Sequence, residues 1–187
     1  LVMASIGSID EARKAVDAGA DIIVAQGWEA GGHVRGTTAT LPLIPQVVDA
    51  VAPVPVVAAG GIADGRGLAA VLCLGAQAAR MGTRFVGAEE ANIHPHYRDR
   101  VLAAASQDTF LSTVYDGNWP DAPGRVLMND LLAAWDAAGR LDGEARPRSG
   151  EAIASMSDGS KIFAYDAQTM HADVTGDIEA GPLWAGQ

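Results

Sequence analysis

The chain has 187 residues, of which 49% are hydrophobic and 19% are charged, a balance typical of a globular protein with enough apolar material for a core. The formal net charge of −10 argues against nucleic acids and anionic membranes as partners, because phosphate surfaces would repel the chain. A single cysteine excludes an intramolecular disulfide and fits a reducing compartment, so we expect a cytoplasmic protein. No apolar run approaches the ~18 residues of a membrane span.

Four short apolar runs in the first 90 residues predict β-strands. They cover residues 1–4, 21–25, 54–59 and 76–81. The second and third contain β-branched residues without polar alternation, which is typical of strands buried on both faces of a parallel sheet.

Helix signals occupy the segments between these runs. Ser8 and Glu11 have the spacing of a capping box, and Asp64 is a candidate cap for a later helix. Two more helices are expected around 43–51 and over 95–106. This alternation predicts four consecutive βα units in a parallel sheet, and right-handed crossovers place every loop that follows a strand on the same side.

The βα pattern ends near residue 107. The segment 116–124 is rich in turn-forming residues, one more helix is expected between 127 and 139, and residues 140–160 are typical of a loop. The sequence therefore predicts two parts: the βα units over 1–107, and a helical and loop segment over 108–187 that covers the active-site side.

The first loop that follows a strand covers residues 26–33 and ends in a histidine. Gly27, Gly31 and Gly32 allow the backbone to approach a ligand or to adopt positive φ. His33 then lies at the carboxyl end of a parallel strand, where such sheets build their sites. The alternative is a surface histidine without a chemical role.

Two further loops after strands contain glycines that could bind an anion. Gly60 and Gly61 precede the N-terminus of a predicted helix, while Gly82 and Thr83 offer two amides and a hydroxyl, to which Arg84 could add a charge. Each loop could instead be a tight turn in which glycine serves geometry alone. In (β/α)8 barrels a phosphate is often held by the loops after strands seven and eight, which these two loops would match.

Two other candidates are interpreted as structural. His94 and His96 flank Pro95 without cysteines or carboxylates at ligand spacing, so we expect a helix start and no metal site. Cys73 lies among small and apolar residues of a predicted helix, and we expect a buried, inert thiol.

The three loops, in this order and spacing, resemble the nitronate monooxygenase family. The matching segments are 26–33, 58–65 and 81–85, followed by 92–95, and the resemblance covers roughly residues 1–140 well. It implies an α/β fold of the FMN-binding (β/α)8 TIM-barrel type. This chain would provide the last four βα units and a small C-terminal helical and loop region.

The resemblance also implies roles for single residues. His33 would be the base or substrate-positioning residue in the oxidation of alkyl nitronates by FMN and O2. Some family members carry a lysine at the position of Ser5 and an aspartate at that of Gln26, so the substrate subclass stays open. The implied cofactor-binding residues are Gln26, Gly32, Gly60, Gly61, Met81, Gly82 and Thr83.

Two alternative functions remain. An FMN- and NAD(P)H-dependent enoyl-acyl-carrier-protein reductase would have similar loops at 29–33 and 60–65, and a truncated remnant would bind phosphate without catalysis. Since a (β/α)8 barrel needs about 250 residues, we expect a fragment of a longer reading frame or a truncated paralogue. Four strands alone would expose unpaired edges, which predicts self-association and weak FMN binding.

Overall fold

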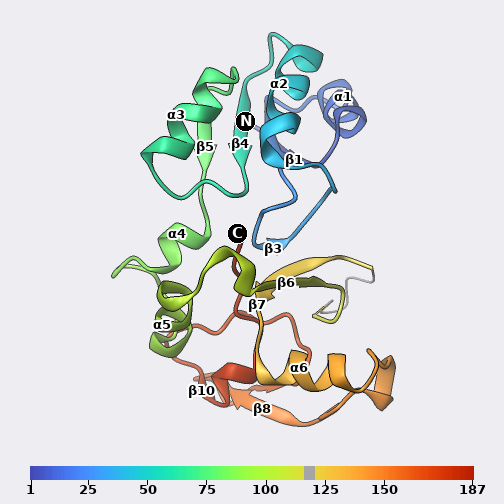
Figure 1. Cartoon of the computed structure of the whole chain (residues 1–187), viewed down its shortest axis with the longest axis vertical. Coiled ribbons are helices and arrows are strands. Elements are labelled where there is room, and N and C mark those ends of the chain that lie inside the picture. Colours follow the sequence, from blue (N-terminus) through green and yellow to red (C-terminus); the bar gives the residue numbers. More distant parts are fainter. Residues whose placement is uncertain (116–120) are drawn as a thin grey trace. The chain divides into compact units, whose positions relative to one another are not determined.

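The computed structural model of the chain describes residues 1–115 and 121–187, so part of the turn-rich segment expected at 116–124 lies outside the described residues. The chain forms two compact units (Figure 1). The first, the N-terminal unit, contains Leu1–Arg84 and Gly186–Gln187; the second, the C-terminal unit, contains Phe85–Ala185.

A four-stranded parallel sheet forms the centre of the N-terminal unit. Its strands are β1 (Met3–Ile6), β2 (Ile22–Gln26), β4 (Val56–Ala59) and β5 (Ala78–Arg80), in the order β1-β2-β4-β5. A two-residue strand, β3 (Gly32–His33), lies in the loop after β2. The four predicted strands are confirmed, and their order is that of successive strands in a (β/α)8 barrel.

The three helices predicted between the first four strands are present, and two of them have the N-caps expected from the sequence. The Ser8 hydroxyl accepts a hydrogen bond from the Glu11 amide at 3.3 Å, and the Asp64 carboxylate accepts from the amide of Arg66. None of the helices in the described residues is long and apolar enough to cross a bilayer. The three helices are α1 (Ile9–Asp17), α2 (Thr40–Val51) and α3 (Gly65–Cys73). A four-residue helix, α4 (Thr83–Val86), follows β5 where the sequence predicted none, and the boundary between the two units falls within it.

The expectation for Cys73 is wrong. Its side chain is exposed and lies at the last residue of α3. Val71 carries the buried face of that helix, and two residues further along an α-helix a side chain points about 200° away. Cys73 therefore faces away from the core.

The core of the N-terminal unit lies between one face of the sheet and its helices. Alternate strand positions point toward α2, as the period of a strand requires, and burial of each large aliphatic side chain contributes about 1.5–3 kcal/mol. On the edge strand, Met3 stays 53% exposed. The central core residues are Ile23, Ala25, Val56, Ala58, Leu43, Ile44 and Val47.

The C-terminal unit combines two small antiparallel sheets with helices. Strands β6 (Thr109–Ser112) and β7 (Gly124–Leu127) pair with each other, and the predicted helix between 127 and 139 is confirmed as α6. Strand β8 lies between β9 and β10. The other elements are α5 (Pro95–Ala103), η1 (Ser106–Asp108), α6 (Asp130–Ala137), η2 (Gly143–Ala145), β8 (Ala152–Ser155), β9 (Lys161–Phe163), β10 (Thr175–Gly176) and η3 (Ile178–Ala180).

The loop expected over 140–160 is wrong at β8. This strand has four residues, Ala-Ile-Ala-Ser, which is too short and too weakly apolar to indicate a strand by its pattern. It is stabilised by pairing on both sides and by burial of Ile153 against Ile162 in one core. Tertiary packing thus outweighs local propensity here.

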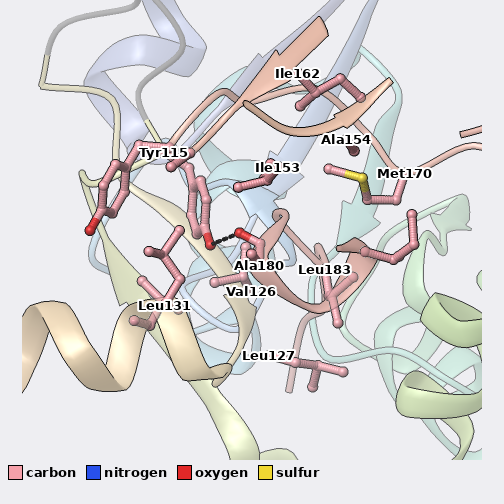
Figure 2. Packing of buried hydrophobic residues seen from close by; sticks show 14 of the residues in the cluster. Tyr115, Val126, Leu127, Leu131, Ile153, Ala154, Ile162, Met170, Ala180 and Leu183 are labelled. Atoms are coloured by element: carbon pink, nitrogen blue, oxygen red, sulfur yellow. Dashed lines mark hydrogen bonds between the residues drawn. The ribbon is translucent and has the colours of Figure 1, made fainter. Parts of the chain in front are cut away.

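A buried hydrogen-bond network lies in the core of the C-terminal unit, and Figure 2 shows one of its bonds, between Tyr115 and Ala180. The Tyr115 hydroxyl donates to the Ala180 carbonyl at 3.0 Å and accepts from the Asn129 side-chain amide at 3.1 Å. The same Asn129 amide lies 3.0 Å from the Gly181 carbonyl, and the Asn129 oxygen caps α6 by accepting from the Leu132 amide. Burial raises the pKa of Tyr115 above its usual range, so its hydroxyl stays a donor.

We predict that Asn129→Ala lowers the free energy of unfolding by about 2–3 kcal/mol, because it removes a cap and leaves buried polar groups without a partner. Urea-induced unfolding followed by circular dichroism measures this loss. The matched control is Ser8→Ala, which removes a partly exposed cap and should cost about 1 kcal/mol. Equal losses in the two variants would contradict the importance of the buried network.

Candidate functional site

Three strands of the N-terminal unit end at the same edge of the sheet. Gln26, Ala59 and Arg80 lie side by side in the parallel register. The loops that begin at Gly27, Gly60 and Met81 therefore leave the sheet together. The structure thus brings together Gln26, at the end of β2, and the three loops that carry the other predicted site residues, at the carboxyl edge where parallel sheets place their sites.

The first loop is braced by the Gln26 side chain. Its Nε2 donates to the His33 carbonyl at 2.9 Å, and its Oε1 accepts from the Arg35 amide at 2.8 Å. Gly32 has a φ of +69°, a conformation that favours glycine. His33 is half-buried on β3. The hydrogen bonds of Gln26 to the His33 carbonyl and the Arg35 amide hold the backbone that carries the imidazole.

The second loop consists of two glycines in left-handed conformations. Gly60 has a φ of +100° and Gly61 a φ of +65°. A Cβ at Gly60 would lie 3.0 Å from the Gly27 carbonyl oxygen, so the first two loops are in close backbone contact. Neither the Gly60 amide nor the Gly61 amide donates to another described residue, which leaves both able to bind a ligand oxygen.

The third loop offers a hydroxyl group and open space. A Cβ at Gly82 would meet no atom within 4 Å, and the Gly82 amide donates to no other residue in the described part of the chain. The Thr83 hydroxyl accepts a hydrogen bond from the Gly186 amide at 2.9 Å, which leaves its own proton for a second partner. Met81 packs against the core, so its backbone is the part available to a ligand.

The N-terminus of α3 differs from the expectation. The amides of Arg66 and Gly67 donate to the Asp64 carboxylate at 2.9 and 3.3 Å, so they are not available to an external anion. Hydrogen bonds from the Arg66 side chain and from these amides lower the pKa of Asp64 to about 2. An anion at the second loop would depend on Gly60 and Gly61, and not on this helix end.

Sequence reasoning missed Glu29 and Thr40, which connect the first two loops. The Glu29 carboxylate accepts from the Thr40 amide at 2.8 Å. The Thr40 hydroxyl lies 2.9 Å from both Glu29 Oε2 and the Gly60 carbonyl, and it has one proton to donate to them. Ala39 could have indicated this contact. An alanine at the N-cap offers no side-chain hydrogen bond, so the first amides of α2 need an acceptor from elsewhere in the chain.

The last two residues connect the first loop with the third. The Gln187 amide donates to the Glu29 carbonyl at 2.9 Å, while the Gly186 amide is bonded to Thr83. A Cβ at Gly186 would lie 2.7 Å from the Glu29 carbonyl oxygen and 2.8 Å from the Gly31 amide nitrogen. Only a glycine fits between these groups, so the dipeptide is closely packed against the candidate site.

The histidine pair at the start of α5 has the expected structural role. His94 Nδ1 accepts from the His96 amide at 3.1 Å and caps the helix. His96 Nε2 lies 2.7 Å from the Glu179 carboxylate. Within residues 1–115 and 121–187 there is no group of three or more histidine, cysteine or acidic side chains placed to hold a metal ion.

The sheet order and the position of the three loops define an α/β protein of the (β/α)8-barrel type, with its candidate site at the carboxyl ends of the strands. The model of the nitronate monooxygenase family matches residues 1–187, so the chain belongs to this family. The family resemblance inferred from the three loops is confirmed.

Known relatives extend beyond the length of this chain. The nitroalkane oxidase of Streptomyces ansochromogenes is 29% identical with a TM-score of 0.72, over 100% of this chain and 51% of its own. FabK of Thermotoga maritima is 42% identical with a TM-score of 0.64, over 71% of this chain and 40% of its own. Both matches support the expected fold class.

Another relative is named for an activity other than nitronate oxidation. The 5-hydroxy-7a-methyl-1-oxo-octahydro-1H-indene-4-carboxyl-CoA dehydrogenase of Rhodococcus jostii is 44% identical over 143 residues, which are 76% of this chain and 39% of the relative. The chain therefore spans less than half of this relative. Family membership alone leaves the substrate of the whole protein open.

We predict that the Asp64 carboxyl titrates near pH 2, far below its ordinary value of 3.8. Because the folded-state pKa is lowered, the stabilisation by this cap is complete above about pH 4 and is lost as the pH falls toward 2. NMR titration of the side-chain carboxyl measures the midpoint. In Arg66→Ala the midpoint should move back toward 3.8, and a midpoint near 3.8 in the unchanged chain would contradict the geometry.

Proposed function

We propose that the protein containing this chain oxidises alkyl nitronates with bound FMN and O2. Family membership supports oxidation of nitro compounds in general, and the similarity to the nitroalkane oxidase of S. ansochromogenes agrees with that class of substrate. The observation that carries the proposal is the meeting of the His33 loop with two glycine loops at one edge of the sheet.

The glycine loops fit the phosphate group of FMN. The amides of Gly60, Gly61 and Gly82 are available as donors among the described residues, and Thr83 adds a hydroxyl proton. Backbone amides can hold a phosphate without a basic side chain, so the net charge of −10 is no obstacle.

The other assigned residues would define the flavin side of the site. Gly32 would allow close approach of the first loop, Gln26 would keep that loop in place, and the backbone of Met81 would border the third loop. When bound, FMN supplies the electron transfer and the oxygen chemistry. The protein supplies orientation and hydrogen bonds.

His33 is proposed as the base or substrate-positioning group. A neutral imidazole can accept a proton from the substrate, and it can also donate a hydrogen bond to an anionic nitronate oxygen. Its loop is held by Gln26, which limits the positions that the imidazole can take.

We predict that His33→Ala in the full-length protein lowers kcat/KM for a nitronate by about 10²–10⁴-fold, the usual contribution of an acid–base residue. Oxygen uptake measures the rate, and the flavin absorption spectrum should stay unchanged. The matched control is His96→Ala, on the surface of the C-terminal unit. Full activity of His33→Ala would exclude the proposed role.

We predict that Gly82→Ala weakens FMN binding at least tenfold while the free energy of unfolding stays within about 0.5 kcal/mol. The added methyl group meets no protein atom, so a loss of affinity would come from the ligand. Quenching of flavin fluorescence measures the dissociation constant. Gly65→Ala is the control because its Cβ is equally free; unchanged FMN affinity in Gly82→Ala would argue against this phosphate site.

A second candidate function is oxidoreduction of an acyl thioester. The identity of 44% with a carboxyl-CoA dehydrogenase favours this class, and the enoyl-acyl-carrier-protein reductase expected as an alternative belongs to it. Consumption of NAD(P)H with an enoyl thioester would favour the second candidate. Oxygen uptake with a nitronate and no pyridine nucleotide would favour the first.

A further inference from the structure

Glu29 belongs to the first loop and contacts three other segments of the N-terminal unit. Its backbone carbonyl accepts from the Gln187 amide, and its carboxylate accepts from Thr40. A Cβ at Gly61 would lie 3.2 Å from the Glu29 Cβ, so the second loop runs directly along the Glu29 side chain. One residue thus contacts the glycine turn, α2 and the end of the chain.

The carboxylate of Glu29 takes the place of a missing helix cap. The N-cap residue Ala39 has no side-chain hydrogen bond. A carboxylate that accepts from the first amide of a helix forms a charge-assisted hydrogen bond at the positive end of the helix dipole. Glu29 therefore fixes the position of Thr40, whose side chain is 6% exposed.

Thr40 passes this constraint on to the glycine turn. The Glu29 carboxylate already holds the Thr40 amide at 2.8 Å. In the arrangement that matters here, the Thr40 hydroxyl donates its one proton to the Gly60 carbonyl at 2.9 Å, and not to Glu29 Oε2, which lies at the same distance. Gly27 leaves the necessary space, because a Cβ at this position would lie 1.9 Å from the Thr40 hydroxyl oxygen. The contact between Thr40 and Gly60 thus requires a glycine at position 27.

Because the peptide bond between Gly60 and Gly61 is planar, the contact between Thr40 and the Gly60 carbonyl also sets the direction of the Gly61 amide. The Gly60 carbonyl and the Gly61 N–H belong to the same peptide plane and point in opposite directions when the bond is trans. A hydrogen bond that holds the carbonyl toward Thr40 therefore directs the N–H away from the protein interior. Gly61 is exposed, so an amide directed away from the interior faces solvent and is accessible to a ligand.

We infer that Glu29 is a positioning residue that, through Thr40, orients the Gly61 amide for phosphate binding. This inference rests on the proposed binding of FMN. It adds the reason why a turn without basic side chains has a defined amide direction before any ligand arrives, which lowers the entropy cost of binding.

The test compares Glu29→Ala, Thr40→Val and Thr40→Ser in the full-length protein, with Ser8→Ala as a cap-loss control outside the network. FMN and riboflavin affinities are measured by quenching of flavin fluorescence. Glu29→Ala and Thr40→Val should each weaken FMN binding about tenfold, a factor typical of one lost charge-assisted hydrogen bond. Riboflavin lacks the phosphate, so its affinity should change less than about twofold.

Thr40→Ser keeps the hydroxyl and should restore FMN affinity to within about twofold. The double variant Glu29→Ala/Thr40→Val should be no weaker than either single variant, because both act on the same peptide plane. Thr40→Val retains the backbone amide that Glu29 caps, so it remains informative if Glu29→Ala does not fold.

A measurement without cofactor separates this inference from the proposed function. The ¹⁵N order parameter of the Gly61 amide should fall in Glu29→Ala and Thr40→Val and stay unchanged in Thr40→Ser and Ser8→Ala. Failure of the unchanged protein to bind FMN would reject the proposed function alone. An unchanged Gly61 order parameter, or equal losses of FMN and riboflavin affinity, would overturn the role of Glu29.

Discussion

The parallel register of β2, β4 and β5 is the constraint on which the candidate site depends. Since Gln26, Ala59 and Arg80 lie in one row, the residues that follow them leave the sheet at one edge whatever their chemistry. The register itself is fixed by the buried face of the sheet, because a shift by one residue would turn Ile23 and Ala58 away from the core. The hydrophobic core thus determines where the polar loops meet.

The loops are held to one another by hydrogen bonds that involve few charged groups. Glu29 is the one carboxylate in this network, and it is used for a helix end and a hydroxyl. The groups left for a ligand are amides and a hydroxyl, which suit an anion despite the acidic composition of the chain. The net charge of the chain therefore disfavours an anionic ligand, whereas the amides and the hydroxyl at these loops favour one.

Much of the N-terminal unit could be predicted from the sequence because its signals are local. A short apolar run that contains β-branched residues, such as Val56–Ala59, indicates a strand of a parallel sheet, and a cap such as Ser8 lies next to the helix it caps. The three loops could be placed because parallel topology puts their ends together. The family could be identified from their order and spacing.

The parts that could not be predicted depend on contacts between distant residues. Thr40 and Gly60 are 20 residues apart in the sequence, and Thr83 and Gly186 are 103 residues apart. No local sequence pattern predicts either contact. Strand β8 exists because its neighbours pair with it. The exposure of Cys73 could not be predicted without knowing which face of α3 is buried, and a nine-residue helix of mostly small and apolar residues does not show this in its sequence.

Gln26 links the identity of one side chain to the path of a whole loop. It donates to the His33 carbonyl and accepts from the Arg35 amide, a pair of tasks that an amide can perform and an ionised carboxylate cannot. An aspartate at this position would be one methylene shorter and would set two oxygens facing each other at the first contact. The path of the histidine loop is therefore set by the identity of residue 26 before any substrate is considered.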